Sequence, residues 1–284
     1  MSAKLSRSAL GALAVALAIA GCGSGQSTTP VIRAADVTAR SPGYRLAGTA
    51  TISVQGGQGR SSHMTMNGSF DRRDRVGTMT AVAGVLGHSV RIPEVLSHLT
   101  VYMPTKAVPN ATKLAPNKRW LKLDMSRAVG GAGISSLPTA TDPSQFVDYL
   151  RAVSSGITND GGATVRGVHT THYHATIDLD RYPRLVAPSR RQAVAASVEN
   201  LEATLQSHTM PLDVWIDRQH LVRRIALNFG ECVSGAHFRF AMSADLYDYG
   251  PQPRPKMPSA SQTYDLTPLL QTTMERVKVG CTRS

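Results

Sequence analysis

Three cysteines carry the most reactive side chains of this 284-residue chain. Cys22 follows directly on small residues, the apolar run 9–20 lies just before it, and Lys4 and Arg7 precede that run. A positive flank, a short apolar run and small residues at the cut are typical of an export signal, and a cysteine there makes it a lipobox. The alternative is an ordinary secretory signal that contains a cysteine. We expect residues 1–21 to be removed and Cys22 to carry the lipid.

The other two thiols, Cys232 and Cys281, lie in the second half of the chain. Outside the cytoplasm two remaining cysteines usually pair, so we expect a Cys232–Cys281 disulfide. A bridge across that loop would stabilise the fold by roughly 4 kcal/mol in the chain-entropy view. The alternative is two free, buried thiols.

His169, His172 and His174 lie close together in one predicted strand. On a strand, His172 and His174 share a face with side chains ~7 Å apart, close enough for Zn²⁺ if a third ligand were present. Packing or solvent exposure explains them equally, and no cysteine or metalloprotease motif supports a metal. We also find no nucleophile elbow, no paired carboxylates in a convincing context and no phosphate loop. The expectation is therefore no metal, no cofactor and no enzyme.

The formal charge of +12 at pH 7 favours contact with anionic surfaces. Export argues against nucleic acid, so phospholipid headgroups or anionic glycolipids are the better partners. A solvated basic surface from an Arg-rich proteome explains the charge as well. Residues 23–30 are rich in Gly, Ser, Thr and Gln, a composition that buries little apolar surface and indicates a tether.

The remaining sequence alternates apolar and polar residues with the period of strands. This pattern recurs at 44–54, 64–70, 79–83, 86–92, 99–103, 121–125, 173–179, 212–216, 225–229 and 238–246. A first helix is expected after Asp142, with Phe146, Leu150 and Val153 on one face. A second runs from about Ser189 to Leu205, and a third begins near Thr267 after a proline-rich stretch.

The segment 167–179 resembles a strand of actinobacterial lipoproteins of the LppX/LprAFG family. The matching positions are Gly167-Val168, Thr170, His172-Tyr173 and Asp178-Leu179. The segment 210–224 is similar to that family's hairpin through Pro211, Val214-Trp215-Ile216-Asp217, Leu221 and Arg223, and Trp120, Leu121 and Leu123 fit another strand. The resemblance covers roughly residues 44–250. It implies an α+β fold of the LolA-like superfamily, a curved antiparallel half-barrel with helices on its concave face around an apolar pocket.

The resemblance further implies a lipoprotein that binds or carries acylated lipid or glycolipid. We expect a signal peptide at 1–21, a flexible tether at 22–40, a half-barrel domain at 41–250, and a proline-rich linker with a docked C-terminal helix at 251–284. The protein would sit on the extracytoplasmic face of the cell membrane. The alternative is an envelope protein of the same fold that senses or binds protein partners without lipid cargo.

The candidate pocket lining comes from both predicted helices and from the predicted hairpin. Its members are Phe146, Leu150, Val194, Val198, Leu201, Leu205, Val214 and Ile216. The helix residues form a stripe that is either plain core or one wall of a cavity. Aromatic residues are only 5% of the chain, and methionine, which repacks easily around a variable acyl chain, is used instead.

Overall fold

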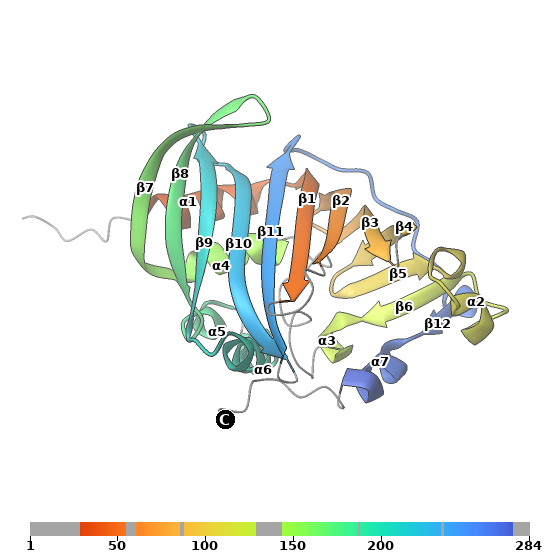
Figure 1. Ribbon diagram of the computed structural model, residues 1–284. Coiled ribbons are helices and arrows are strands. Elements are labelled where there is room, and N and C mark those ends of the chain that lie inside the picture. Colours follow the sequence, from red (N-terminus) through yellow and green to blue (C-terminus); the bar gives the residue numbers. More distant parts are fainter. Residues whose placement is uncertain are drawn as a thin grey trace, which may run out of the picture.

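One curved twelve-stranded sheet organises the computed structural model, which describes residues 29–54, 61–85, 88–128, 144–186, 188–233 and 236–274 (Figure 1). The strand order across the sheet is β12-β6-β5-β4-β3-β2-β1-β11-β10-β9-β8-β7. Neighbouring strands are antiparallel, except that β12 pairs parallel with β6. The two outer strands, β12 and β7, do not pair with each other, so the sheet stays open. The half-barrel that the sequence predicted is therefore confirmed.

The strands are β1 (Gly43–Val54), β2 (Ser61–Asp71), β3 (Val76–Val85), β4 (His88–Ser97), β5 (Thr100–Pro104), β6 (Trp120–Asp124), β7 (Val153–Val165), β8 (Val168–Asp178), β9 (Thr209–Asp217), β10 (Val222–Val233), β11 (Ala236–Tyr247) and β12 (Thr263–Asp265). The α-helices are α1 (Pro30–Arg40), α2 (Ala111–Leu114), α3 (Met125–Ala128), α4 (Ser144–Tyr149), α5 (Tyr182–Leu185), α6 (Pro188–Leu205) and α7 (Thr267–Met274). Short 3-10 turns are η1 (Thr105–Ala107), η3 (Leu150–Ala152) and η4 (Ala260–Gln262).

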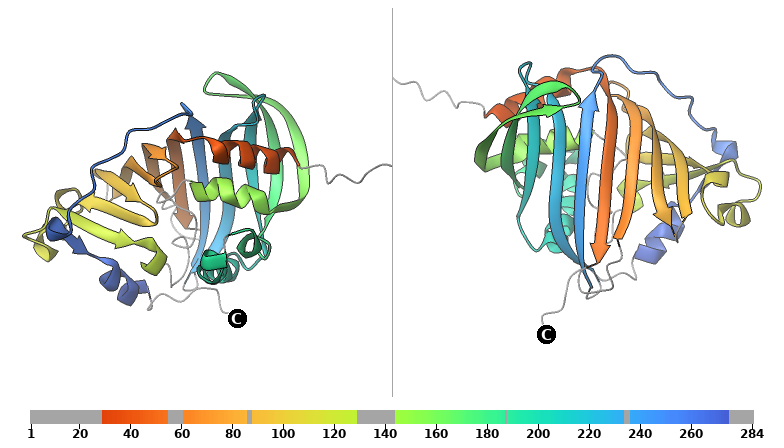
Figure 2. Two further views of the ribbon diagram at one scale, coloured as in Figure 1. Left: turned by 180° about the vertical axis from the view of Figure 1, so that it is seen from behind. Right: turned by 45° about the horizontal axis from the view of Figure 1, so that its top comes forward.

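Helices α1, α4, α5 and α6 lie on the concave side of the β7–β11 half of the sheet, as the view from behind shows (Figure 2). Strand alternation explains why this side is apolar, since every second residue of a strand points to the same face. On β9, for example, Met210, Leu212, Val214 and Ile216 are buried, whereas Asp213 and Trp215 are half-buried on the other face. The core lies between these inward residues and the helices.

Helix α1 corrects the expected flexible tether over its second half. Thr29 caps the helix by accepting a hydrogen bond from the Ile32 N–H at 3.3 Å, and Pro30 suits the first helical position. Its buried residues, Val31, Ala34, Ala35 and Thr38, follow the helical spacing. Thr38 also accepts a hydrogen bond from the Val222 N–H at 2.9 Å, which fastens α1 to β10. This helical spacing and the Thr29-Pro30 start are present in the sequence, and the tether prediction extended past them from the Gly-, Ser- and Thr-rich residues 23–30.

Strand β7 was also missed, and the predicted first helix ends earlier than expected. Val153 belongs to β7, because η3 closes the helix at Ala152; Asp142 lies outside the described residues. The sequence of β7 contains Gly156, Gly161 and Gly162, and its pairing with β8 shifts register three times. Gly156 and Gly161 have φ of +67° and +99°, a conformation that glycine adopts without strain. These irregularities erase the period-2 pattern.

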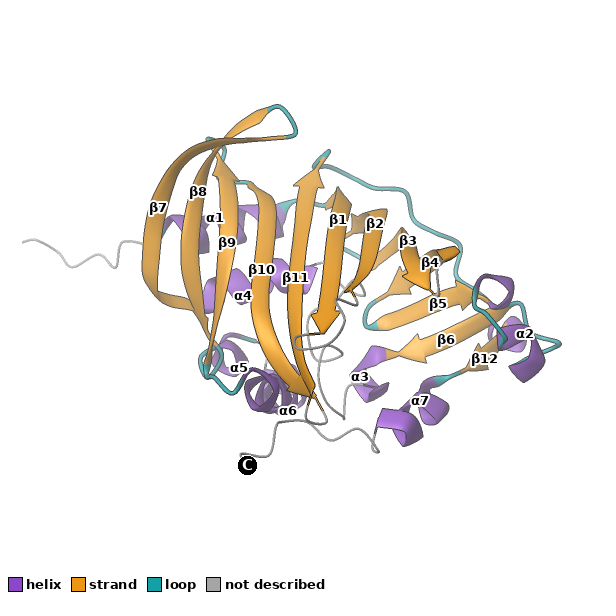
Figure 3. Ribbon diagram, viewed as in Figure 1, coloured by secondary structure: helices purple, strands orange, loops and turns teal. Residues whose placement is uncertain are grey.

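The C-terminal segment returns to the far edge of the sheet (Figure 3). Thr263 and Tyr264 pair with Trp120 and Leu121 of β6, and α7 begins at Thr267 beside α3. Cys281 and the side chain of Cys232 lie outside the described residues, so their disulfide stays a prediction. Cys22 and the signal segment 1–21 lie outside them as well. None of the described helices is both long and apolar enough to cross a membrane.

Candidate functional site

The apolar residues predicted to line a pocket come together in one cluster on the concave face. Leu150, Val198, Leu201, Val214 and Ile216 are all at most 4% exposed. Val194 and Leu205 pack against this cluster while remaining partly exposed, whereas the side chain of Phe146 lies outside the described residues. The predicted set thus shares one apolar interior. Whether this interior admits a ligand stays a prediction.

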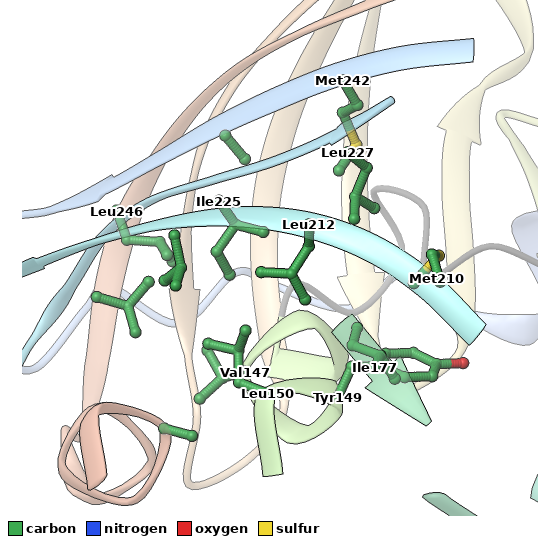
Figure 4. Packing of buried hydrophobic residues seen from close by; sticks show 14 of the residues in the cluster. Val147, Tyr149, Leu150, Ile177, Met210, Leu212, Ile225, Leu227, Met242 and Leu246 are labelled. Carbon is green, nitrogen blue, oxygen red and sulfur yellow. The ribbon is translucent and has the colours of Figure 1, made fainter. Parts of the chain in front are cut away.

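The α4 segment packs directly against the sheet (Figure 4). Val147 and Leu150 face Leu212 of β9 and Ile225 of β10. Nearby, the ring of Tyr149 stacks on Tyr182 with centroids 4.1 Å apart. Burial, with a smaller contribution from Tyr182, raises the pKa of the Tyr149 phenol, which therefore stays neutral. Among the described residues, these contacts around α4 are made by apolar and aromatic side chains.

A pocket of about 670 Å³ lies at one end of this interior, where the start of α1 meets the β7–β8 hairpin and the β9–β10 turn. Its lining residues are Pro30, Arg33, Gly162, Ala163, Thr164, His169, Thr170, Thr171, Tyr173, Ile216, Asp217, Arg218 and His220. We call it the rim pocket. Ile216 is the member of the predicted set that also lines it. The pocket therefore adjoins the inward face of β9.

The rim pocket is basic. Arg33 and Arg218 bring two permanent charges, and Asp217 is the one carboxylate among its described lining residues. That carboxylate is already engaged: Oδ1 accepts hydrogen bonds from the backbone N–H groups of Gln219 and Leu221 at 2.8 and 2.9 Å, and Oδ2 accepts one from Arg223 at 2.6 Å. The balance of charge favours an anionic group.

Two smaller pockets continue this end of the molecule. One of about 360 Å³ shares His169, Asp217 and Arg218 with the rim pocket, and one of about 470 Å³ lies between Arg45 and Arg166. Both arginines form ion pairs with nearby carboxylates, since Arg45 lies 3.6 Å from Asp248 and Arg166 lies 3.9 Å from Asp245. The sequence did not reveal this basic end, because its members lie far apart in the chain, from Arg33 in α1 to Asp248 after β11.

The three histidines separate onto two faces. His169 lines the rim pocket, while His172 and His174 lie on the outer face of β8 and both contact Asp213 of β9. Asp213 was not among the predicted site residues. Asp213 lies opposite His174 because of the register in which β8 and β9 pair. The local sequence does not reveal that register.

The sequence matches no established family model. It is 28% identical over 159 residues to an uncharacterized 31.2 kDa protein encoded in the rplA–rplJ intergenic region of Streptomyces griseus. That match covers 54% of this chain, and the chain spans about half the length of that relative.

Solved structures with a similar fold include three proteins of low sequence identity. The Mycobacterium tuberculosis lipoprotein LppX is 10% identical, with 80% of this chain and 96% of LppX covered and a TM-score of 0.45. LprF from Mycobacterium bovis is 12% identical, with 81% and 96% covered and a TM-score of 0.41. A LolA superfamily protein from Nitrosomonas europaea is 4% identical, with 80% and 94% covered and a TM-score of 0.33. The half-barrel arrangement of this chain is shown by its own strand order, an open and mostly antiparallel sheet with helices on its concave side (Figure 2).

Proposed function

We propose that this chain is an envelope lipoprotein that holds an acylated lipid or glycolipid, with the anionic head in the rim pocket and the acyl chain along the concave face. One observation carries the proposal: the basic pocket meets the apolar face of β9 at Ile216. An amphipathic lipid needs this combination of a cationic recess and an adjoining apolar surface. The sequence resemblance to lipid-binding lipoproteins supports the same class of ligand.

The acyl chain would follow the inward side chains of β9 from Ile216 to Met210, a path of about 20 Å at strand rise. These side chains are at most 4% exposed, so entry requires the concave-face helices to move away from the sheet. Each methylene of the acyl chain that becomes buried stabilises the complex by about 0.8 kcal/mol. A long acyl chain can therefore offset the loss of helix contacts.

Placement near a membrane supports the same proposal. Only seven residues, or eight Cα-to-Cα steps, separate Cys22 from Pro30, and Pro30 lines the rim pocket. A fully extended chain spans at most ~3.6 Å per residue, so the first residue of α1 lies within about 29 Å of the anchored cysteine. Lipidation at Cys22 would thus hold the basic end beside the lipid headgroups.

Replacing Cys22 by alanine should abolish metabolic labelling with palmitate and release the protein into the medium. The reason is that the thiol is the proposed attachment point for the diacylglycerol. The matched control is Cys232→Ala, which should keep the label. Labelling that persists in Cys22→Ala would show that the lipid, if any, is attached elsewhere.

Lipid uptake should be saturable, and Ala163→Trp should lower the affinity for lipid at least tenfold by filling the rim pocket. Ala163 is only partly buried there, so its enlargement should change the melting temperature little. The measurement is transfer of a phospholipid with a fluorescent acyl chain from phosphatidylcholine vesicles, with and without phosphatidylglycerol, to exported residues 23–284.

Ala241→Trp, on the outer face of β11, is the control and should bind as the wild type does. Val198→Trp tests the α6 side: if α6 walls a cavity, the variant blocks uptake and stays stable, whereas overpacking a fixed core destabilises by about 1–3 kcal/mol. Absence of saturable uptake by the wild type would refute lipid carriage and favour the protein-binding alternative.

A further inference from the structure

The outer face of the half-barrel carries a cluster of metal-ligating side chains that the lipid-binding proposal does not use. Asp160, His172 and Asp213 come from the neighbouring strands β7, β8 and β9, and each offers one ligand atom within 4.8 Å of the others. His174 lies two residues after His172 on the same face of β8. The sheet thus gathers two imidazoles and two carboxylates from three strands.

Both imidazoles point at the same oxygen atom. The Nε2 atom of His172 lies 2.9 Å from Oδ1 of Asp213, and the Nδ1 atom of His174 lies 3.3 Å from it. His174 can therefore hold the Asp213 carboxylate in place. The three described residues of this cluster whose ligand atoms lie mutually close enough to share one ion are Asp160, His172 and Asp213.

The ring of His172 is held from its other side. Its Nδ1 atom lies 3.8 Å from Oδ2 of Asp160, so the second carboxylate of the cluster is close to the same ring. The ring also stacks on Trp215, with centroids 4.2 Å apart and an interplanar angle of 0°. A ligand that is already oriented loses little side-chain freedom when a metal binds.

The local charge also fits a divalent cation. Two neutral imidazoles with two carboxylates carry about −2, and Arg224, the cation packed on Trp215, is paired with Asp245 at 2.6 and 3.1 Å. The side chains of His172, His174 and Asp213 are 24%, 45% and 35% exposed, so an ion can reach them from solvent. Imidazole ligands favour zinc and its transition-metal neighbours over Mg²⁺ or Ca²⁺.

We propose that Asp160, His172 and Asp213 bind one Zn²⁺ ion on the outer face of the sheet, with His174 positioning the Asp213 carboxylate. The fourth position is left to water or to a ligand from a partner. Such an ion would tie β8 to β9 and, through Asp160, to the edge strand β7. The site is independent of the rim pocket and of lipid binding.

Titration of metal-free protein with ZnCl₂ by isothermal calorimetry, with the thiols alkylated, tests the site. We expect one Zn²⁺ per chain and a higher melting temperature with zinc. Asp160→Asn, His172→Gln and Asp213→Asn should each lower the affinity at least tenfold. His174→Gln, which changes only the side chain that positions Asp213, should lower it by roughly 10-fold to 100-fold.

His208→Gln is the matched control, because His208 belongs to a second acidic cluster with Asp180 and Glu202. Its zinc affinity should equal that of the wild type. The circular dichroism spectrum of each metal-free variant is compared with that of the wild type to check that it folds. Because three ligands are replaced separately, one variant that misfolds does not prevent the test. No stoichiometric zinc binding, or binding that all three ligand variants retain, would overturn the proposal, as would binding lost only in His208→Gln.

Discussion

Replacing Asp217 by alanine should lower the free energy of unfolding by about 3–5 kcal/mol, the range for breaking a buried ion pair from one side. Asp217 is 6% exposed, and its carboxylate accepts hydrogen bonds from Gln219, Leu221 and Arg223. Alanine would leave two backbone N–H groups and the largely buried Arg223 guanidinium without this acceptor. Urea denaturation followed by circular dichroism measures the change.

Two further variants test whether this loss of stability comes from the Asp217 carboxylate. Asp217→Asn keeps an acceptor for the turn but removes the charge, so its loss should be smaller. Asp248→Ala removes an exposed partner of Arg45, a pair 3.6 Å apart, and should change stability by less than about 1 kcal/mol. An Asp217→Ala protein as stable as Asp248→Ala would show that the β9–β10 turn does not depend on this side chain.

Raising the pH from about 5 to 8 should destabilise the protein by up to about 3 kcal/mol through a single carboxyl, that of Glu94. This residue lies opposite Met79 on the concave face of β4, and burial raises its pKa from the usual 4.5 to about 7. Between these values the folded state binds the proton more tightly than the unfolded state does, so stability falls as pH rises. A difference of about 2.5 pKa units corresponds to roughly 3 kcal/mol.

Glu94→Gln isolates this contribution, because the amide stays neutral at every pH. Its free energy of unfolding should exceed that of the wild type at pH 8, and the difference should shrink toward pH 5. The measurement is urea denaturation of both proteins at several pH values. A wild type and a variant with parallel pH profiles would rule out the buried carboxyl as the cause.

The sequence predicts the strands that have one buried and one solvated face. On β9 and β11 alternate residues such as Leu212, Val214 and Phe240 are buried, so the period-2 signal is strong. It fails for β7, whose register shifts interrupt the alternation. Helix α1 differs, because its buried residues follow a helical spacing that is visible in the sequence after the Thr29 cap.

The candidate sites divide in the same way. Apolar residues such as Val198, Leu201 and Val214 are predictable because each lies on a periodic element, and the fold brings them together. The rim pocket instead joins Arg33 to Arg218, residues that only the closure of α1 on the β9–β10 turn brings close. Turn residues have no period, so no window of sequence reveals such a pocket.

The two edges of the open sheet affect how neighbouring copies of the protein can associate. An unclosed sheet exposes rows of backbone groups at its edges, which invite strands from neighbouring molecules. Here β7 ends the sheet with three register shifts, and at the other edge β12 covers β6 with a strand of only three residues. A buckled edge and a very short one are poor templates for added strands. Under the proposed anchoring at Cys22, copies held in one bilayer can therefore meet edge to edge without joining into a continuous fibre.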